Sequence, residues 1–291
     1  MKLMKIVVYY KIKNKTSFSK RVIPYIYGLG EYRPEFITDT KWISKKKLKA
    51  TINTKSVSQL TDATIGMLRF SSGSFLENIE IEECSHINKE LKLFQNNEAI
   101  IGAILKPALA DIKAHYRIIK SVFKLGFDFI KDDDVIEFSD DRVKKIYKYC
   151  GKKIAYFHKT SNQKQFTNLP TMIIPWIDGW SLVEEFSKNK KAPLMTHCAN
   201  MPLQISWSSH IVLSRLAGAD FIIVPDSKFD KTANLKEMIE AVSRKIKNLP
   251  STRIIIAGAI TPKRIEEIKK SINKKFHKFI GFAIGSWLIR I

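Results

Sequence analysis

Short apolar runs recur along the last two thirds of the chain, and stretches with helical periodicity separate most of them. The apolar runs are residues 99–106, 127–131, 153–158, 171–176, 192–197, 220–225, 253–258 and 278–285, and the amphipathic stretches are residues 115–127, 139–151, 179–189, 208–219, 232–248 and 262–273. Nearly continuous apolar strands that alternate with helices are typical of a parallel sheet. Eight such units predict an α/β fold, a closed (β/α)8 TIM-type barrel, with an open doubly wound sheet as the alternative.

Two units of this repeat are incomplete. Residues 161–170 are too short and too polar for a full third helix. The sequence stops at residues 286–291, soon after the eighth apolar run. We therefore expect a barrel that is trimmed at its C-terminal edge.

The first third of the chain follows a different pattern. Residues 4–12 and 48–56 alternate between apolar and polar positions like strands, and residues 57–70 have the period of one helix. The sequence therefore predicts two domains. A small α+β domain, a reduced ferredoxin-like unit, occupies residues 1–95, and the barrel occupies residues 96–291.

The chain is strongly basic, with a formal net charge of +22 and a pI near 9.8. Lysine supplies 40 of its 50 basic residues, and these lysines are scattered instead of forming an arginine-rich stripe that could read base edges. We therefore expect a solvated lysine surface and no specific nucleic-acid binding. A positive field would also concentrate a phosphorylated small molecule.

The cysteines and the apolar runs restrict the class of protein further. Cys84, Cys150 and Cys198 are far apart, an odd number and without CxxC spacing, so neither a disulfide framework nor a zinc site is expected. No apolar run is long enough to cross a bilayer, and the N-terminal residues lack the features of a signal peptide. We expect a cytoplasmic protein that does not associate with membranes.

Polar residues follow several predicted strands, where the active site of a β/α barrel is built. Lys106 ends the first strand, and Lys131 ends the second, with Asp133 and Asp134 directly after it. Because strand side chains alternate between faces, Lys131 points into the barrel if Phe129 does. Carboxylates beside a lysine suit Mg²⁺, and an uncharged lysine amine can add carbon dioxide to become a further carboxylate-like ligand. The alternative is an acidic, solvated turn that caps the next helix.

Several segments resemble the catalytic domain of the RuBisCO large subunit, in a shortened form closest to the RuBisCO-like proteins. GAILKPALA at 102–110 and LGFDFIKDDD at 125–134 are similar to that family's KPKLGL and GxDFxKDDE motifs. APLMTHCAN at 192–200 resembles its fifth strand, and AGADFIIVPDSKFD at 217–230 resembles its sixth strand and mobile loop. A weaker match at 62–84 extends the resemblance to roughly residues 62–285.

The resemblance implies a role for each matching residue. Lys131 would be the carbamylated lysine, and Asp133 and Asp134 the carboxylates that complete a magnesium site. Lys106 would handle protons at the substrate carbon, His197 would belong to the active site, and Lys228 would close over the substrate. Gly258, Gly281 and Gly285 would hold phosphate through backbone N–H groups. The resemblance also implies a homodimer, because the family completes each site with the partner's N-terminal domain.

The chain also departs from the family pattern. The changes are Asp134 for a glutamate, Ala108 for a lysine, Cys198 for a phosphate-binding arginine, Met201 for a histidine, Met67 for an asparagine, Ala257 for a serine, and residues 282–284 for a glycine run. We therefore expect enolisation or isomerisation of a phosphorylated sugar or ketose-like substrate through an enediolate, not carboxylation. The alternative is a non-catalytic RuBisCO-like binding or scaffold protein. His158 stands where the family has asparagine and is interpreted as a local hydrogen-bonding residue.

Overall fold

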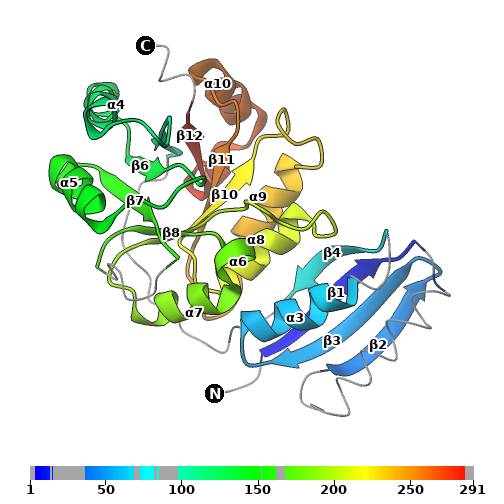
Figure 1. Cartoon of the computed structure of the whole chain (residues 1–291). Helices are drawn as coiled ribbons and strands as arrows, with labels where there is room; N and C mark the ends of the chain where they lie inside the picture. Colours follow the sequence, from blue (N-terminus) through cyan, green and yellow to red (C-terminus); the bar gives the residue numbers. More distant parts are fainter. Residues whose placement is uncertain are drawn as a thin grey trace.

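The computed structural model describes residues 4–13, 15, 37–68, 73–81, 84, 98–151, 153–161 and 168–285. Its larger part is a closed barrel of eight parallel strands, and its smaller part is a four-stranded antiparallel sheet (Figure 1). The closed ring confirms the predicted TIM-type barrel and excludes the open sheet.

The barrel strands follow one another in chain order around the ring. They are β5 (Ile100–Leu105), β6 (Phe129–Asp132), β7 (Ala155–Lys159), β8 (Thr171–Ile173), β9 (Leu194–Thr196), β10 (Phe221–Pro225), β11 (Arg253–Ala257) and β12 (Ile280–Ile284). β12 closes the ring by pairing with β5, with Gly281 opposite Ile100. The helices outside the strands are α4 (Ile112–Leu125), α5 (Asp140–Cys150), α6 (Pro175–Asp178), α7 (Trp180–Asn189), α8 (Trp207–Leu216), α9 (Leu235–Ser243), α10 (Pro262–Ser271) and the 3-10 helix η1 (Lys274–Phe279).

Local chemistry explains where these helices begin and end. Asp111 caps α4 by accepting a hydrogen bond from the Ala114 N–H, and Gly126 ends it in a left-handed conformation at φ 67°. The apolar run at 171–176 is a strand only to Ile173, because Pro175 opens α6. The predicted helix at 232–248 is shorter than expected and ends at Ser243.

Aromatic side chains fill the middle of the barrel. Phe157 packs edge-on against Phe129 and Phe221, with ring centroids 6.0 and 5.4 Å away. The neighbouring Ile130 belongs to the separate apolar layer between the strands and the helices. Successive residues of β6 therefore alternate between the interior and the helix layer, as its period requires.

The N-terminal sheet contains β1 (Met4–Lys11), β2 (Ile37–Ser44), β3 (Lys47–Thr54) and β4 (Phe75–Glu80), in the order β2-β3-β1-β4, with the helix α3 (Val57–Leu68). β1, β3 and α3 were expected from the periodicity, whereas β2 and β4 were not. The small α+β domain is thus confirmed in its general form.

The small domain is joined to the barrel by hydrogen bonds between backbone segments. Leu76 of β4 donates to the Gln204 carbonyl at 2.7 Å and accepts from the Ser206 N–H at 3.0 Å. At the start of α3, the Val57 N–H donates to the Glu184 carboxylate of α7 at 2.7 Å. The predicted boundary between residues 95 and 96 lies outside the described residues and stays a prediction.

Some sequence expectations also fall on residues outside the described ranges. They include most of the short connection at 161–170, the last residues 286–291 and the side chain of Met67. Among the described residues, no helix has the length and hydrophobicity needed to cross a membrane.

Candidate active site

Lys131 lies at the open end of the barrel interior, two residues after Phe129 on the same face of β6. Its side chain is fully buried, and its Nζ donates to the Asp132 carbonyl at 2.7 Å. Burial lowers the pKa of Lys131 to about 8, although the negative charges of Asp134 and Asp133 oppose that shift. A substantial neutral fraction of this amine is therefore present slightly above neutral pH.

The first acid of the KDDD segment, Asp132, points away from the barrel interior. Asp132 is fully buried. It accepts a hydrogen bond from the Tyr156 hydroxyl at 2.7 Å and another from the backbone N–H of Lys159 at 2.9 Å. Burial raises the pKa of Asp132 to about 7 in spite of these two hydrogen bonds. Asp132 thus braces β6 against β7, and only the next two acids face the mouth.

Asp133 and Lys106 meet across the ends of β6 and β5. Lys106 Nζ lies 3.5 Å from Asp133 Oδ2, and the Asp133 side chain is only 7% exposed. The other oxygen of Asp133 accepts the Asp134 N–H at 3.0 Å. Burial raises the pKa of Asp133, and the positive charge of Lys106 opposes that rise. The structure therefore brings together three of the residues that the sequence singled out.

The segment that carries Lys106 is held from outside by two helices. His115 of α4 contacts the Pro107 carbonyl through Nε2 at 3.1 Å, and Arg142 of α5 donates to the Ala110 carbonyl at 2.6 Å. Arg142 also contacts His115 Nδ1 at 2.8 Å. His115 had no expected role, and its contacts now show that it supports the turn after β5.

His197, at the end of β9, faces the same acids. Its Nε2 lies 3.8 Å from Asp134 Oδ1, and its Nδ1 accepts the Ala199 N–H at 3.1 Å. Burial and the nearby Lys131 lower the pKa of His197 to about 3, so the ring is neutral at physiological pH. Because Nδ1 is an acceptor, the proton of the neutral ring is on Nε2 and is directed toward the site.

Lys159 belongs to this cluster, although the sequence reasoning missed it. Its Nζ donates to the Asp134 carbonyl at 3.0 Å. The neighbouring His158 is buried and contacts the Pro170 carbonyl through Nδ1 at 2.9 Å. The alternation that placed Lys131 two residues after Phe129 would also have placed Lys159 two residues after Phe157.

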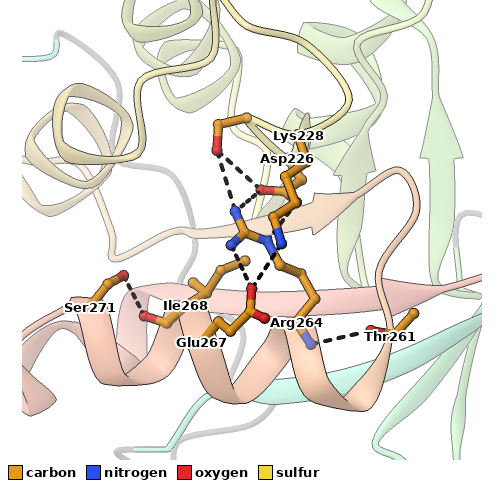
Figure 2. A network of polar contacts seen from close by, with 8 residues as sticks. Asp226, Lys228, Thr261, Arg264, Glu267, Ile268 and Ser271 are labelled. Carbon is orange, nitrogen blue, oxygen red and sulfur yellow. Dashed lines mark hydrogen bonds and ion pairs between the residues drawn. The ribbon is translucent and has the colours of Figure 1, made fainter.

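The loop lysine, Lys228, is not part of this cluster. Its Nζ forms an ion pair with Glu267 of α10 at 2.9 Å, and its side chain is 61% exposed. Arg264 of α10 contacts the same Glu267 oxygen at 3.0 Å and binds both oxygens of the buried Asp226 at 2.7 and 2.8 Å. Figure 2 shows Lys228 and Arg264 converging on Glu267.

The three glycines expected to hold phosphate occupy different places. Gly285 lies beside Lys106, at the mouth. Gly258 has φ +90°, and the Phe229 ring packs against it. Gly281 lies opposite Ile100, at the far end of β5 from Lys106, where a side chain would collide with Ile100 and Ile255. The structure thus brings only Gly285 to the Lys106 side of the mouth.

The residues at the mouth can offer a magnesium ion three oxygen ligands only when Lys131 carries a carbamate. No group of three His, Cys, Asp or Glu side chains with metal-site geometry occurs among the described residues. Asp133 and Asp134 provide two hard oxygen donors, and a carbamate on Lys131 would provide a third. The buried amine with its lowered pKa is suited to that reaction.

Comparisons with known proteins give matches in structure but not in sequence. No protein-family model and no curated protein matches the chain. The Rubisco-like protein from Rhodopseudomonas palustris has a TM-score of 0.72 at 14% identity, over 100% of this chain and 96% of that one. Rubisco from Pyrococcus horikoshii OT3 has a TM-score of 0.73 at 16% identity, over 97% and 83%. The dimeric archaeal Rubisco from Hyperthermus butylicus has a TM-score of 0.70 at 13% identity, over 97% and 85%.

These likenesses extend over both parts of the molecule. The chain has the fold of the Rubisco and Rubisco-like structures, as the motif at residues 102–134 predicted. At identities of 13–16% the likeness describes the fold, and the chemistry has to be argued from the side chains at the mouth.

Proposed function

We propose that the chain is a RuBisCO-like, magnesium-dependent enzyme that enolises or isomerises a phosphorylated sugar or ketose-like substrate through an enediolate. The observation that carries this proposal is the convergence of Lys106, Lys131 and Asp133 at the open end of the barrel, with Asp134 and His197 beside them. Lysine and histidine can move and donate protons, while the acids and a carbamate can hold a cation.

In this proposal Lys131 would carry a carbamate, and together with Asp133 and Asp134 it would hold Mg²⁺. The bound ion would supply Lewis acidity toward two substrate oxygens. Lys106 is assigned the proton at the substrate carbon, because its amine lies at the mouth, 3.5 Å from Asp133. His197 donates from Nε2 to a substrate oxygen, since its Nδ1 is occupied by the Ala199 N–H.

The surface and the neighbours support two further parts of the proposal. A net charge of +22 attracts a phosphorylated substrate to the protein surface. One of the structural neighbours is described as a dimeric archaeal Rubisco, and we propose a homodimer for this chain as well. Analytical ultracentrifugation tests the dimer independently of activity.

The decisive experiment for the site detects the carbamate directly. The protein is incubated with Mg²⁺ and ¹³C-bicarbonate, and carbon NMR is recorded for the wild type, Lys131→Ala and Lys106→Met. We expect a carbamate signal in the wild type and in Lys106→Met, and none in Lys131→Ala. A signal that persists in Lys131→Ala refutes the assignment.

Turnover is measured in deuterium oxide with a panel of ketose phosphates, by following deuterium incorporation next to the carbonyl. We expect the loss of Lys131 or Lys106 to reduce exchange by about 1,000-fold or more, because several kcal/mol of transition-state stabilisation disappear. The exposed Lys145→Ala on α5 is the control, with unchanged exchange. No carbamate signal and no exchange in the wild type would favour the non-catalytic scaffold.

A further inference from the structure

We propose that Lys159 binds an oxyanion of the substrate, either a phosphate or a carboxylate group, at the barrel mouth. The inference rests on the proposed function for the location of the substrate and adds a binding residue that the family resemblance did not supply. It is carried by the position of the ammonium group, its hydrogen-bonding capacity and the charges around it.

The position follows from the register of β7. Phe157 packs in the barrel interior, so Lys159, two residues later, is directed to the same side at the end of the strand. Its Nζ reaches across to β6 and donates to the Asp134 carbonyl at 3.0 Å. This hydrogen bond holds the ammonium group next to the acids of the site.

The ammonium group of Lys159 keeps donors for a ligand. A lysine has three N–H bonds, and in the described part of the chain Lys159 uses one of them, to a neutral carbonyl. It forms no ion pair there, although its charge acts on Asp178 of α6 and on His197 of β9. Asp178 Oδ2 accepts the Ile174 N–H at 2.8 Å. A half-buried cation that forms no ion pair with any described carboxylate is suited to an incoming anion.

The positive charge of Lys159 also compensates for a cation that is missing at position 198. Cys198 stands where the resemblance predicts an arginine that contacts phosphate, so β9 provides no cation there. Burial raises the pKa of the Cys198 thiol to about 12, so this side chain does not become an anion that would repel the ligand. Lys159, at the end of β7, brings a positive charge close to His197. Lysine binds phosphate as a point charge, without the fixed fork of arginine.

The test measures anion binding without magnesium or bicarbonate, so its result does not depend on the carbamate experiment. Inorganic phosphate and, in a separate arm, acetate are titrated into the full-length protein at about 150 mM NaCl, where weak surface binding is screened. The variants are Lys159→Met, which keeps the length of the side chain, and Lys159→Arg, which keeps its charge. Lys148→Met on the outer helix α5 is the matched control for net charge.

We expect Lys159→Met to weaken binding by about tenfold or more, because a charge-assisted hydrogen bond is lost. Lys159→Arg and Lys148→Met should stay within about twofold of the wild type. Binding of phosphate but not acetate would identify the anion as a phosphate, and the reverse would identify a carboxylate. Should Lys159→Met fail to fold, Lys159→Gln and a sulfate-soaked wild-type crystal, with sulfate within hydrogen-bonding distance of Lys159 Nζ, give the same answer.

Three results would overturn the inference. They are phosphate and acetate binding that is equal in the wild type and Lys159→Met, equal weakening in Lys148→Met, or no binding of either anion to the wild type. In each case the carbamate signal on Lys131 can still appear, so the proposed magnesium site would stand or fall separately.

Discussion

The two sides of the barrel mouth differ in how their charged residues are held. On the side of β5, β6 and β7, Lys131 and Asp133 are buried, and each has a hydrogen-bond or ion-pair partner. On the side of β10 and β11, Lys228 is exposed and is tied to α10 through Glu267. The first side therefore holds its charged groups in fixed positions, whereas Lys228 on the second side is paired with a residue of α10 at the surface.

This difference separates the parts of the proposed chemistry that depend on fixed geometry from those that depend on movement. The surrounding packing fixes the positions of buried charged side chains. Burial also removes water from these groups, and their pKa values shift because of it. An exposed lysine on a loop exchanges partners easily, since a surface ion pair is weak. Lys228 can therefore leave Glu267 without loss of folding, whereas Lys131 has no other position available.

The largest expected effect concerns the buried side. At pH 7 the wild type buries a charged Lys131, which lowers the free energy of unfolding. This destabilisation decreases as the pH rises through the folded pKa of about 8 toward the ordinary value of 10.5. The free energy of unfolding of the wild type should therefore rise by about 2 kcal/mol relative to Lys131→Met between pH 7 and 9.5. Urea unfolding in carbon dioxide-free buffer measures this difference. Parallel pH profiles for the two proteins would contradict the buried position of a titrating amine.

The next effect concerns the attachment of the β10 loop to α10. Asp226→Ala removes the carboxylate that binds Arg264 through two hydrogen bonds, and we expect a loss of about 2 kcal/mol at pH 7. Burial raises the pKa of Asp226, but Arg264 and two backbone N–H groups outweigh it and hold the pKa below its ordinary value of 3.8. The stabilisation by the Asp226–Arg264 pair is therefore present at neutral pH and is lost as the pH falls below about 4. An equal loss in Asp226→Ala at pH 7 and pH 2.5 would contradict this linkage.

The smallest effect is expected at Lys228. Because both members of its ion pair with Glu267 are exposed, Lys228→Met should change the midpoint of thermal unfolding by less than about 1 °C. If Lys228 closes over the substrate, the same variant should still raise KM or lower kcat by about tenfold, while Glu267→Gln should leave turnover unchanged. Unchanged kinetics in Lys228→Met would restrict the site to the β5–β9 side of the mouth.

The sequence predicted most of the residues on the buried side of the barrel mouth and fewer of the contacts on its exposed side. Alternation from Phe129 gave the inward direction of Lys131, because the period of a strand is the same in every fold. The same rule applied to Phe157 places Lys159 at the mouth, and it places His158, between them, on the opposite face of β7. Gly281 was assigned by its place in a motif, and its position beside Ile100 depends on which strand closes the ring.

The alternation of apolar strands and amphipathic helices by itself determined that the chain forms a parallel α/β sheet, with a closed barrel as the preferred form, and the residues at the strand ends indicated which chemistry could occur there. Only the tertiary structure decided that the sheet closes into a ring, that Asp132 contacts β7 while Asp133 meets Lys106, and that Lys228 pairs with Glu267 of α10. The physical reason is that periodicity acts over a few neighbouring residues, whereas burial, pKa shifts and ion pairs arise between segments far apart in the chain.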